Sequence, residues 1–555
     1  MALRYPFLMC ALVTAGCGDN APSHGPDAAG TEDTLFACEA LEVAGTTSLA
    51  HVSSTLVGAV KLEMERVEAA LSANPSTEEG EAEYTALGFD RYTLGEGIPH
   101  VQRTDLGGTT DFATRKSLAY FVHLSDPQLA DDESPIRLGN LDNPIFGGGL
   151  RPQEAYVGQM LSAFNRTLTR IEGLGREFDF GVITGDCIDS AQYNELRWFI
   201  DIMDGASGVE TDSGEDNDPV AGVDDPKDPF DAVAFPAPWY FVFGNHDLQV
   251  VGTSVTADSA GVELGAVGVL GTRDYREWGA PVSNEPIPPD ANRRFVDRDQ
   301  IISELQNTPS LPGPVGHGFA DGASTEFGAN YAVDVVPGLL RLISIDTNDD
   351  TGGGQFGMFT QSRLDGFLIP ALEQAQSDGV LVMLASHHPS GGIDRREAEN
   401  GDVIEEALEP EQLRAAIAAY PNVILALVGH SHDNRVKHIA GADAEHPGYW
   451  EMTTSAIADW PTQVRVLEIV DNGNDTLSIF ATLVDHDEDT CLERRFRRLS
   501  AIDYVSGWSG RVSADPLDLN VELIVPIPSS VQAAVASAAA SAATRIESQT
   551  TLALP

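Results

Sequence analysis

Residues 237–247 read "APWYFVFGNHD", an apolar run that stops at Gly244 and gives way to Asn245, His246 and Asp247. A short apolar run bounded by a turn residue predicts a buried strand. The end of this strand therefore carries an amide, an imidazole and a carboxylate. Taken alone, "GNHD" is also typical of an ordinary loop, because Gly and Asn tolerate left-handed backbone. Its meaning depends on whether the same arrangement recurs in the chain.

Four other predicted strands end in the same way. The polar residues at their ends are Asp126 and Gln128 in "FVHLSDPQ", Asp186 in "FGVITGD", His387 and His388 in "LVMLASHHP", and His430 and His432 in "LALVGHSH". Strand ends of one sheet lie along one edge, so residues distant in sequence can converge there. Five of the 13 histidines stand at such ends, which favours one shared site over scattered core histidines.

In this order, the motifs resemble those of the calcineurin-like metallophosphoesterase superfamily, over about residues 115–490. The resemblance implies an α/β fold of the α+β type. We therefore expect a four-layer αββα sandwich of two mixed β-sheets flanked by helices, with long loop insertions. It also implies two divalent metal ions bridged by one carboxylate.

Carried onto this chain, the resemblance makes Asp186 the bridging carboxylate. It assigns two groups of three further ligands, one to each ion: Asp126, Gln128 and His432, and Asn245, His387 and His430. Carboxylate, amide and imidazole ligands suit borderline ions such as Mn, Fe, Zn or Co.

The resemblance also implies roles beside the ions. His246 is expected to stabilise the phosphoryl oxygens or to protonate the leaving group, and Asp247 is expected to orient His246 by a hydrogen bond. His388 is expected to line the pocket without binding a metal ion.

Gln128 departs from the family pattern, which usually has histidine at this position. Its amide oxygen is a harder and weaker donor than imidazole. Three interpretations stay open: Gln128 binds the ion directly and shifts the preference toward harder ions such as Mn, it holds a metal-bound water, or this metal position is weak.

Substrate contacts are less clearly marked. Arg137 follows the acidic stretch Asp131–Glu133 and is a candidate phosphate contact, as are Arg435 and His317. A cluster of ion pairs on the surface is the plainer interpretation of Arg137 and its acidic neighbours.

The composition excludes some functions. The chain has 555 residues, 42% of them hydrophobic, with a net charge of −52 and a pI of about 4.3. So acidic a chain repels nucleic acid and anionic membranes, so neither is an expected partner.

The N-terminus has the pattern of an export signal. Arg4 precedes the apolar stretch 5–16, and small residues lead into Cys17, as in a bacterial lipoprotein signal. Thr14 is unusual for that signal, so ordinary cleavage stays open. We expect export to the periplasm, outer membrane or cell surface, with Cys17 lipidated.

The domain organisation follows from these patterns. We expect a signal peptide (1–17), a disordered tether (18–34), an N-terminal extension (35–114), the metallophosphoesterase domain (115–490) with an acidic insertion at 209–231, and a C-terminal extension (491–555). Export favours a disulfide between Cys38 and Cys491. Cys187 is expected to be a buried free thiol.

Periodicity places the remaining elements. Helices are predicted over 56–74, 154–175, 193–205, 361–379 and 529–547. Strands are predicted over 117–126, 178–186, 237–247, 339–347, 380–389, 422–433 and 448–457, with a hairpin over 464–485. The stretch 248–330 is expected to be loop-rich, and the chain after about 500 to be irregular.

The sequence therefore predicts an exported phosphoesterase acting on small phosphate mono- or diesters. In such an enzyme a dimetal-bound hydroxide attacks phosphorus directly. The alternative is a non-catalytic surface lipoprotein that retains the fold and binds a ligand.

Overall fold

The computed structural model describes residues 54–137, 139, 142–144, 148–211, 226–255, 287–308, 312–349, 355–393, 404 and 406–544. The predicted signal peptide, the tether, Cys17 and Cys38 lie outside these residues, as does most of the acidic insertion. Within the described ranges, no helix combines the length and the apolar character needed to cross a membrane.

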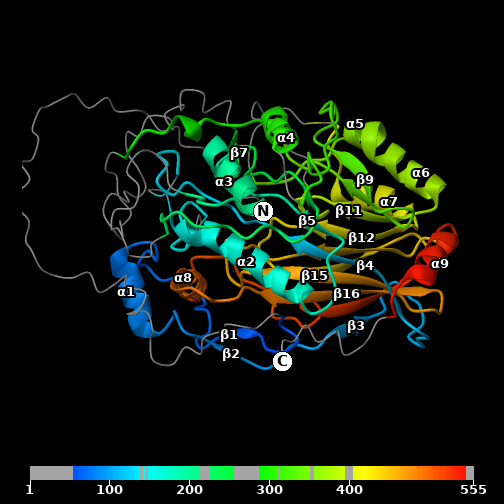
Figure 1. Cartoon of the computed structure of the whole chain (residues 1–555), viewed down its shortest axis with the longest axis horizontal. Helices are drawn as coiled ribbons and strands as arrows, with labels where there is room; N and C mark the ends of the chain where they lie inside the picture. Colours follow the sequence, from blue (N-terminus) through cyan, green and yellow to red (C-terminus); the bar gives the residue numbers. More distant parts are fainter. Residues whose placement is uncertain are drawn as a thin grey trace, which may run out of the picture.

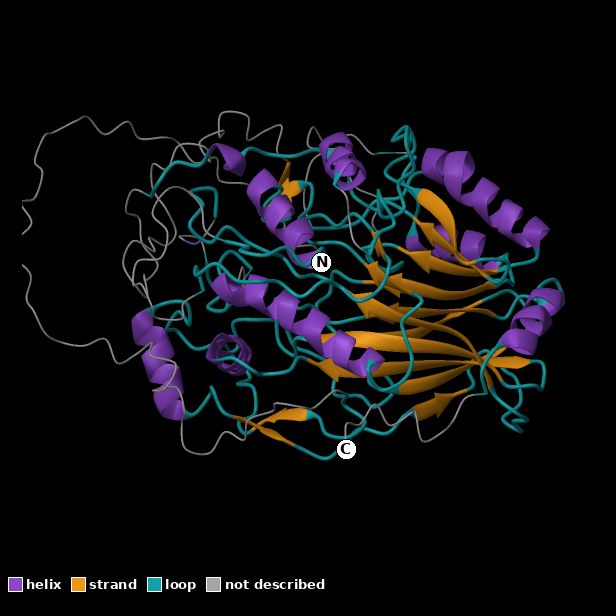
Figure 2. Ribbon diagram, viewed as in Figure 1, coloured by secondary structure: helices purple, strands orange, loops and turns teal. Residues whose placement is uncertain are grey.

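Two large sheets form the centre of the molecule (Figures 1 and 2). The seven-stranded sheet has the order β3 (Val101–Arg103), β17 (Val521–Pro526), β16 (Thr476–Asp485), β15 (Gln463–Asp471), β4 (Lys116–Leu124), β5 (Phe180–Ile183) and β6 (Trp239–Phe241). The six-stranded sheet has the order β13 (Arg435–Ala440), β14 (Gly448–Thr453), β12 (Val423–Val428), β11 (Leu381–Ala385), β10 (Leu340–Ser344) and β9 (Tyr331–Val336).

Both sheets are mixed, as predicted. β4, β5 and β6 are parallel, and β10, β11, β12 and β14 are parallel in the other sheet. The hairpin β15–β16 is antiparallel, and so are β9 and β13 to their neighbours. Two small ribbons complete the strands, β1 (Val60–Leu62) with β2 (Tyr92–Leu94), and β7 (Gln249–Val250) with β8 (Ser254–Val255).

Helices cover the outer faces. They are α1 (Glu78–Leu87), η3 (Glu154–Tyr156), α2 (Val157–Glu172), α3 (Tyr193–Met203), η5 (Ala291–Arg293), α4 (Arg298–Asn307), α5 (Gln361–Arg363), the π-helical turn η6 (Leu364–Leu368), α6 (Ile369–Asp378), α7 (Pro410–Ala418), α8 (Cys491–Ser506) and α9 (Gln532–Ser541). The rings of Phe199 on α3 and Trp239 on β6 meet edge to face, with centroids 5.8 Å apart.

The alternation of side chains along β11 shows the layering. Leu381, Met383 and Ala385 belong to the core shared by the two sheets. Val382 and Leu384 point the other way, into a second core that contains residues of η6, α6 and α7. Because successive side chains of a strand face opposite sides of the sheet, β11 is buried on both faces. The four-layer sandwich predicted from the sequence is confirmed.

The helix predicted over 56–74 is wrong. This segment contains β1 followed by turns, although Val67 and Leu71 still pack against α8. Their backbone N–H groups donate to the carbonyls of Val505 and Ser506, 3.0 Å away in both cases. A helix leaves its last carbonyls without internal partners, so the end of α8 binds this segment and competes with helix formation in it.

The prediction of irregular structure after residue 500 is also wrong. α8 begins before this point with a capping box between Thr490 and Glu493 and ends at Gly507, whose φ of 90° favours glycine. β17 then joins the main sheet beside β16. Since β3 pairs with β17, this sheet reaches beyond the predicted range 115–490 on both sides.

The loop-rich stretch 248–330 contains more structure than predicted, including α4. The base of the acidic insertion is closed by two backbone hydrogen bonds between Val209 and Phe230, with N···O distances of 2.8 and 3.0 Å. The C-terminal Ala-rich helix is confirmed as α9, which is shorter than the predicted 529–547.

The acidic excess generates the first testable expectation. With 85 acidic and 33 basic residues, the folded chain repels itself, and salt screens this repulsion over a distance that falls from about 10 Å at 0.1 M to about 3 Å at 1 M. We expect the midpoint of thermal unfolding to rise as NaCl is increased over this range, with KCl giving the same rise. A midpoint that falls or stays constant would contradict the expectation.

Candidate metal centre

The carboxyl ends of the parallel strands bring the predicted ligands together. Asp126 and Gln128 follow β4, Asp186 follows β5, and Asn245 follows β6 in the seven-stranded sheet. His387 follows β11, and His430 and His432 follow β12 in the other sheet. The two sheets therefore contribute to one site from opposite sides.

The backbone at these strand ends is unusual. Five predicted ligands have left-handed backbone, with φ between 44° and 69°: Asp126, Gln128, Asp186, His430 and His432. Side chains other than glycine rarely adopt this conformation, which tends to cluster at functional sites. Each chain turns sharply as it leaves its strand.

Four of the predicted ligands meet around one point. His387 Nε2 lies 2.9 Å from Asn245 Oδ1 and 3.1 Å from Asp186 Oδ2. His430 Nδ1 lies 3.1 Å from the same Asn245 oxygen and 3.2 Å from His387 Nε2. All four side chains belong to the group that was predicted to hold the second ion together with the bridging carboxylate.

Hydrogen bonds made by the outward-facing atoms of these side chains determine which of their atoms face the centre of the group. Asn245 donates its Nδ2–H to the carbonyl of Gly252 at 2.9 Å, so Oδ1 faces the histidines. His387 donates its Nδ1–H to the carbonyl of Thr184 at 2.7 Å, so a neutral His387 presents a lone pair on Nε2. Lone pairs on Asn245, Asp186 and His387 then face one another, which is stable only with a cation between them.

Without a metal ion, a proton is the available cation. Burial lowers the pKa of His387, but the charge of Asp186 outweighs this and raises it to about 9. A divalent ion would displace that proton, as metal binding to protein ligands generally does.

Asp126, Gln128 and His432 form the second group. His432 Nε2 lies 3.3 Å from Asp126 Oδ1, and Gln128 Nε2 lies 3.4 Å from Asp186 Oδ2. Gln128 is buried, yet its Oε1 has no hydrogen-bond partner within the described structure. A buried amide oxygen without a donor is costly, and coordination of an ion would satisfy it.

The donor set therefore fits two divalent ions. Carboxylate, amide and imidazole atoms converge in two groups that share Asp186. Gln128 Oε1, which has no donor in the described structure, and Asn245 Oδ1, which faces His387 and His430, are acceptors of the kind that bind such ions. Two triads of carboxylate and imidazole atoms within ligating distance occur in the described chain, Asp126–Asp186–His387 and His387–His388–His430. Both fall within this site.

His246 lies beside the predicted ligands. Its Nδ1–H donates to the carbonyl of Asp189 at 2.9 Å, and its Nε2 lies 3.9 Å from Asp186 Oδ2. Burial lowers the pKa of His246 to about 4, against the opposing effect of Asp186. The neutral ring therefore presents a lone pair on Nε2, and a bound phosphate anion would favour its protonation.

Asp247 does not orient His246, which corrects the prediction. Its carboxylate accepts four backbone N–H bonds instead, from Gly244, Asp186, Cys187 and Ile188, at 2.7 to 3.2 Å. Asp247 thus fixes the turn that carries Asp186. His246 takes its orientation from Asp189.

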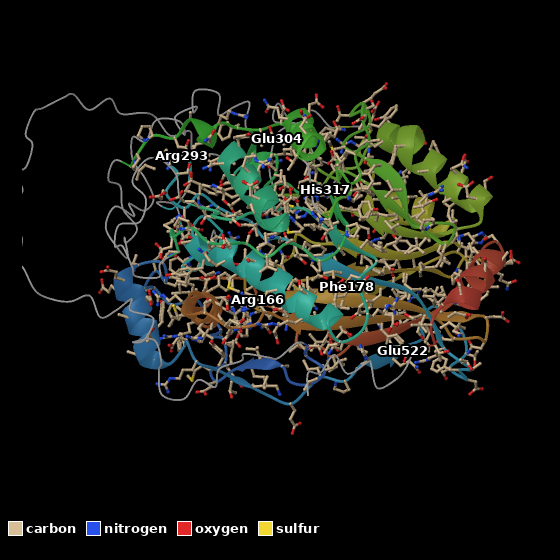
Figure 3. All side chains as sticks on the ribbon, in the orientation of Figure 1. Arg166, Phe178, Arg293, Glu304, His317 and Glu522 are labelled. Carbon is tan, nitrogen blue, oxygen red and sulfur yellow. The ribbon has the colours of Figure 1, made fainter. Side chains whose placement is uncertain are left out.

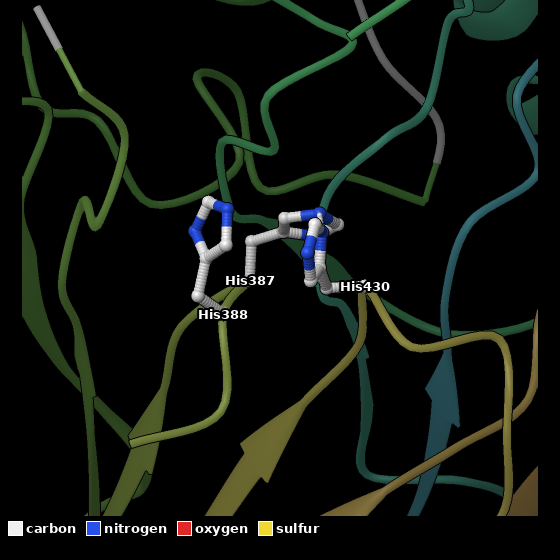
Figure 4. A group of neighbouring side chains, drawn as sticks. All are labelled: His387, His388 and His430. Carbon is white, nitrogen blue, oxygen red and sulfur yellow. Dashed lines mark hydrogen bonds between the residues drawn. The ribbon is translucent and has the colours of Figure 1, made fainter. Parts of the chain in front are cut away.

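His388 lies against the ligand histidines, as Figure 4 shows. Its ring centroid is 4.4 Å from that of His430, and its Nδ1 is 2.9 Å from Thr347 Oγ1. His388 is buried beside the ligands, and it also belongs to a triad within ligating distance.

The three predicted substrate contacts pair with other residues and do not lie among the predicted metal ligands. Arg137 is fully buried and pairs with Asp189 and Glu154, so its guanidinium is an internal support. Arg435 begins β13 and pairs with Asp433 and Asp518. His317 is buried against Trp239, with ring centroids 3.3 Å apart, and can be located in Figure 3.

The acidic stretch beside Gln128 is a buried ion-pair cluster. Asp131 pairs with Arg293 at 2.8 Å, and Asp132 pairs with Lys227 at 2.6 Å. The plainer interpretation of this stretch was right in kind, although the pairs lie inside the protein and not on its surface.

Sequence reasoning missed Asp459, which lies between β14 and β15. Its Oδ2 is 2.5 Å from His432 Nδ1, and Arg151 Nε donates to its Oδ1 at 2.9 Å. A carboxylate on the far nitrogen of a ligand histidine fixes the ring and raises its basicity. No motif surrounds Asp459, so only the structure reveals it.

The cysteines agree with their predictions where they can be followed. Cys187 is buried and free. Cys491 is disulfide-bonded, and its pairing with Cys38 stays a prediction because Cys38 lies outside the described residues.

Comparison with known proteins gives likeness of structure alone. No family model and no curated protein sequence matches the chain. Among solved structures, it is similar to a dimetal phosphatase from Danio rerio (13% identity, 66% of this chain and 96% of that one, TM-score 0.34). It is also similar to a purple acid phosphatase from seeds of yellow lupin, Lupinus luteus (11%, 72% and 56%, 0.30), and to PhoD (8%, 74% and 79%, 0.27). These TM-scores are too low to carry an assignment, which rests on the side chains described above.

Gln128 offers a direct test of the metal position formed by Asp126, Gln128 and His432. If its Oε1 binds an ion, Gln128→His should shift the preference from Mn²⁺ toward Zn²⁺, because imidazole is a softer ligand than an amide oxygen. Competition between the two ions, followed by elemental analysis of the dialysed protein, measures this shift. An unchanged ratio of bound ions would show that Gln128 is not a ligand.

Asp459 should influence the same ion through His432. Asp459→Asn keeps the shape of the side chain but removes its charge, so we expect about a 10- to 100-fold loss in affinity for one of two bound ions. Isothermal titration of the metal-free protein with Mn²⁺ measures it. Asp433→Asn, which alters a carboxylate near His432 that pairs with Arg435 instead, is the control and should leave both affinities unchanged.

Proposed function

We propose that this chain is a metal-dependent hydrolase of phosphoric esters, in which two divalent ions share Asp186. The observation that carries the proposal is the convergence of Asn245 Oδ1 and Asp186 Oδ2 on His387 Nε2, at 2.9 and 3.1 Å, an arrangement that needs a cation. Asp126, Gln128 and His432 provide the second position.

When bound, such a pair of ions supplies a water molecule of lowered pKa and neutralises charge on the phosphoryl oxygens. The protein's part is to hold its ligands in place. Asp247 fixes the turn of Asp186 through four N–H groups, Asp459 fixes His432, and the carbonyl of Thr184 fixes His387. A site assembled before substrate arrives needs little rearrangement during the reaction.

His246 is the residue proposed to act on the substrate. Its Nε2 lies 3.9 Å from Asp186 Oδ2, and its side chain is 12% exposed. Once protonated, Nε2 can donate to a phosphoryl oxygen or to the oxygen of the leaving group. The carbonyl of Asp189 keeps the ring oriented by accepting from Nδ1–H.

The location is part of the proposal. Residues 1–17 support export, with lipidation at Cys17, so that the substrates are small phosphate mono- or diesters outside the cytoplasm. The runner-up is a surface protein that retains the fold as a ligand-binding module. The completeness of the ligand set favours the enzyme.

Chromogenic esters test the proposal. The purified chain, supplied in turn with Mn²⁺, Zn²⁺, Fe²⁺ and Mg²⁺, should hydrolyse p-nitrophenyl phosphate or its bis-ester and should contain close to two equivalents of transition metal. Asn245→Ala should lower metal content and activity together. His246→Ala should keep the metal and lower kcat by about 10²- to 10⁴-fold, the usual contribution of a general acid.

His446→Ala is the matched control, because His446 is a partly exposed histidine that pairs with Asp443 away from the site. This variant should leave metal content and hydrolysis unchanged. Full activity in Asn245→Ala and His246→Ala would refute the proposed site. Two bound ions without hydrolysis of either ester would favour the ligand-binding module.

A further inference from the structure

A chain of buried hydrogen bonds crosses from one sheet to the other and ends at Asp126. Thr454 Oγ1 lies 2.7 Å from His123 Nδ1, and His123 Nε2 lies 2.9 Å from Thr184 Oγ1. Thr184 Oγ1 lies 2.7 Å from Ser125 Oγ, which lies 2.5 Å from Asp126 Oδ2. All five side chains have no exposed surface. Apart from Asp126, none of them belongs to the predicted site.

The direction of each hydrogen bond follows from the carboxylate of Asp126 at the end of the chain. A carboxylate only accepts, so Ser125 donates its one hydroxyl proton to Asp126. Ser125 must then accept from Thr184, and Thr184 must accept from His123 Nε2–H. Burial and the charge of Arg465 lower the pKa of His123 to about 3, so the ring is neutral and its Nδ1 accepts from Thr454.

Every donor in this chain therefore points toward Asp126. Aligned hydrogen bonds polarise one another and so strengthen the last bond of the chain, from Ser125 to Asp126 Oδ2. Asp126 Oδ2 is fixed in this way, and the backbone N–H of His430 also donates to it at 3.1 Å. Asp126 Oδ1 is left facing His432 Nε2, where the ion would lie.

We propose that Ser125, Thr184 and His123 are positioning residues that hold Asp126 in the orientation of a metal ligand. The inference rests on the metal centre proposed above. It assigns a role to the polar residues of "VHLSD" and "ITGD" that do not bind an ion themselves.

Close packing against Gly429 restricts the position of Ser125. A Cβ on Gly429 would lie 2.0 Å from Ser125 Oγ and 2.6 Å from Asp126 Oδ2. Contacts this short are not tolerated, so glycine is required at the start of "GHSH". The end of β12 can therefore approach β4 only because residue 429 has no side chain.

Ser125→Ala removes the last donor with little change in volume. In Mn²⁺ titrations of the metal-free full chain, we expect about a 10- to 100-fold weaker affinity for one of the two ions, as for other outer-shell partners of ligands. Hydrolysis at limiting Mn²⁺ should fall, and saturating Mn²⁺ should restore kcat. A purely structural role would not give this recovery.

Two further variants test other hydrogen bonds of the same chain. Thr184→Val, nearly isosteric, should reproduce the loss, and Thr454→Val, at the far end, should give a smaller one. Ser455→Ala is the control, because Ser455 is also fully buried but bonds to the carbonyl of Gln463, outside the chain. It should leave both affinities unchanged, and thermal unfolding of the metal-free variants shows whether each one folds.

The outcomes separate this inference from the proposed function. Wild-type protein that binds two ions, with Ser125→Ala and Thr184→Val binding them equally well, would refute the positioning role alone. Wild-type protein that binds no ion and hydrolyses neither ester would refute the metal centre itself. A loss of affinity in Ser455→Ala equal to that in Ser125→Ala would also refute the positioning role.

Discussion

Mutual repulsion among lone pairs is the constraint around which the site is organised. Asn245 Oδ1 and Asp186 Oδ2 lie 2.9 and 3.1 Å from His387 Nε2, and each of the three atoms is turned inward by a hydrogen bond on its other side or by the turn that carries it. Such an arrangement opposes folding unless a cation occupies it. The surrounding structure therefore has to hold atoms together that would otherwise separate.

The sandwich meets this demand by its topology. Parallel strands of both sheets end at the same edge, so each ligand needs only a sharp turn after its strand to reach the centre. The left-handed residues make these turns, and Asp247 ties down the one at Asp186. Buried carboxylates and hydroxyls behind the ligands then fix individual rings and oxygens.

Much of this could be predicted from the sequence. Short apolar runs that end in ligand-type residues marked the strands, and their order marked the two-sheet sandwich, because local patterns of this kind depend on few neighbours. The helix predicted over 56–74 failed since Val67 and Leu71 bond to the end of α8, which lies more than 400 positions away. The α8 helix and β17 were missed because their charged or short segments carry no clear periodicity.

The residues of the site also fall into those that the sequence predicts and those that it does not. Predicted ligands come together because motifs encode them, whereas Asp459, Asp189 and His123 act through contacts between distant segments and carry no local signature. Arg137, Arg435 and His317 were chosen as isolated charged residues near a motif, and their partners lie in other segments. The position of an arginine or histidine near a motif in the sequence does not show where its side chain lies in the folded protein.

Thr184 belongs to both halves of the centre. Its carbonyl oxygen accepts from His387, which faces one ion position, and its hydroxyl donates through Ser125 to Asp126, which faces the other. A shift of this residue that improves one contact alters the second. A displacement of Thr184 would therefore disturb the support of both groups of predicted ligands at once.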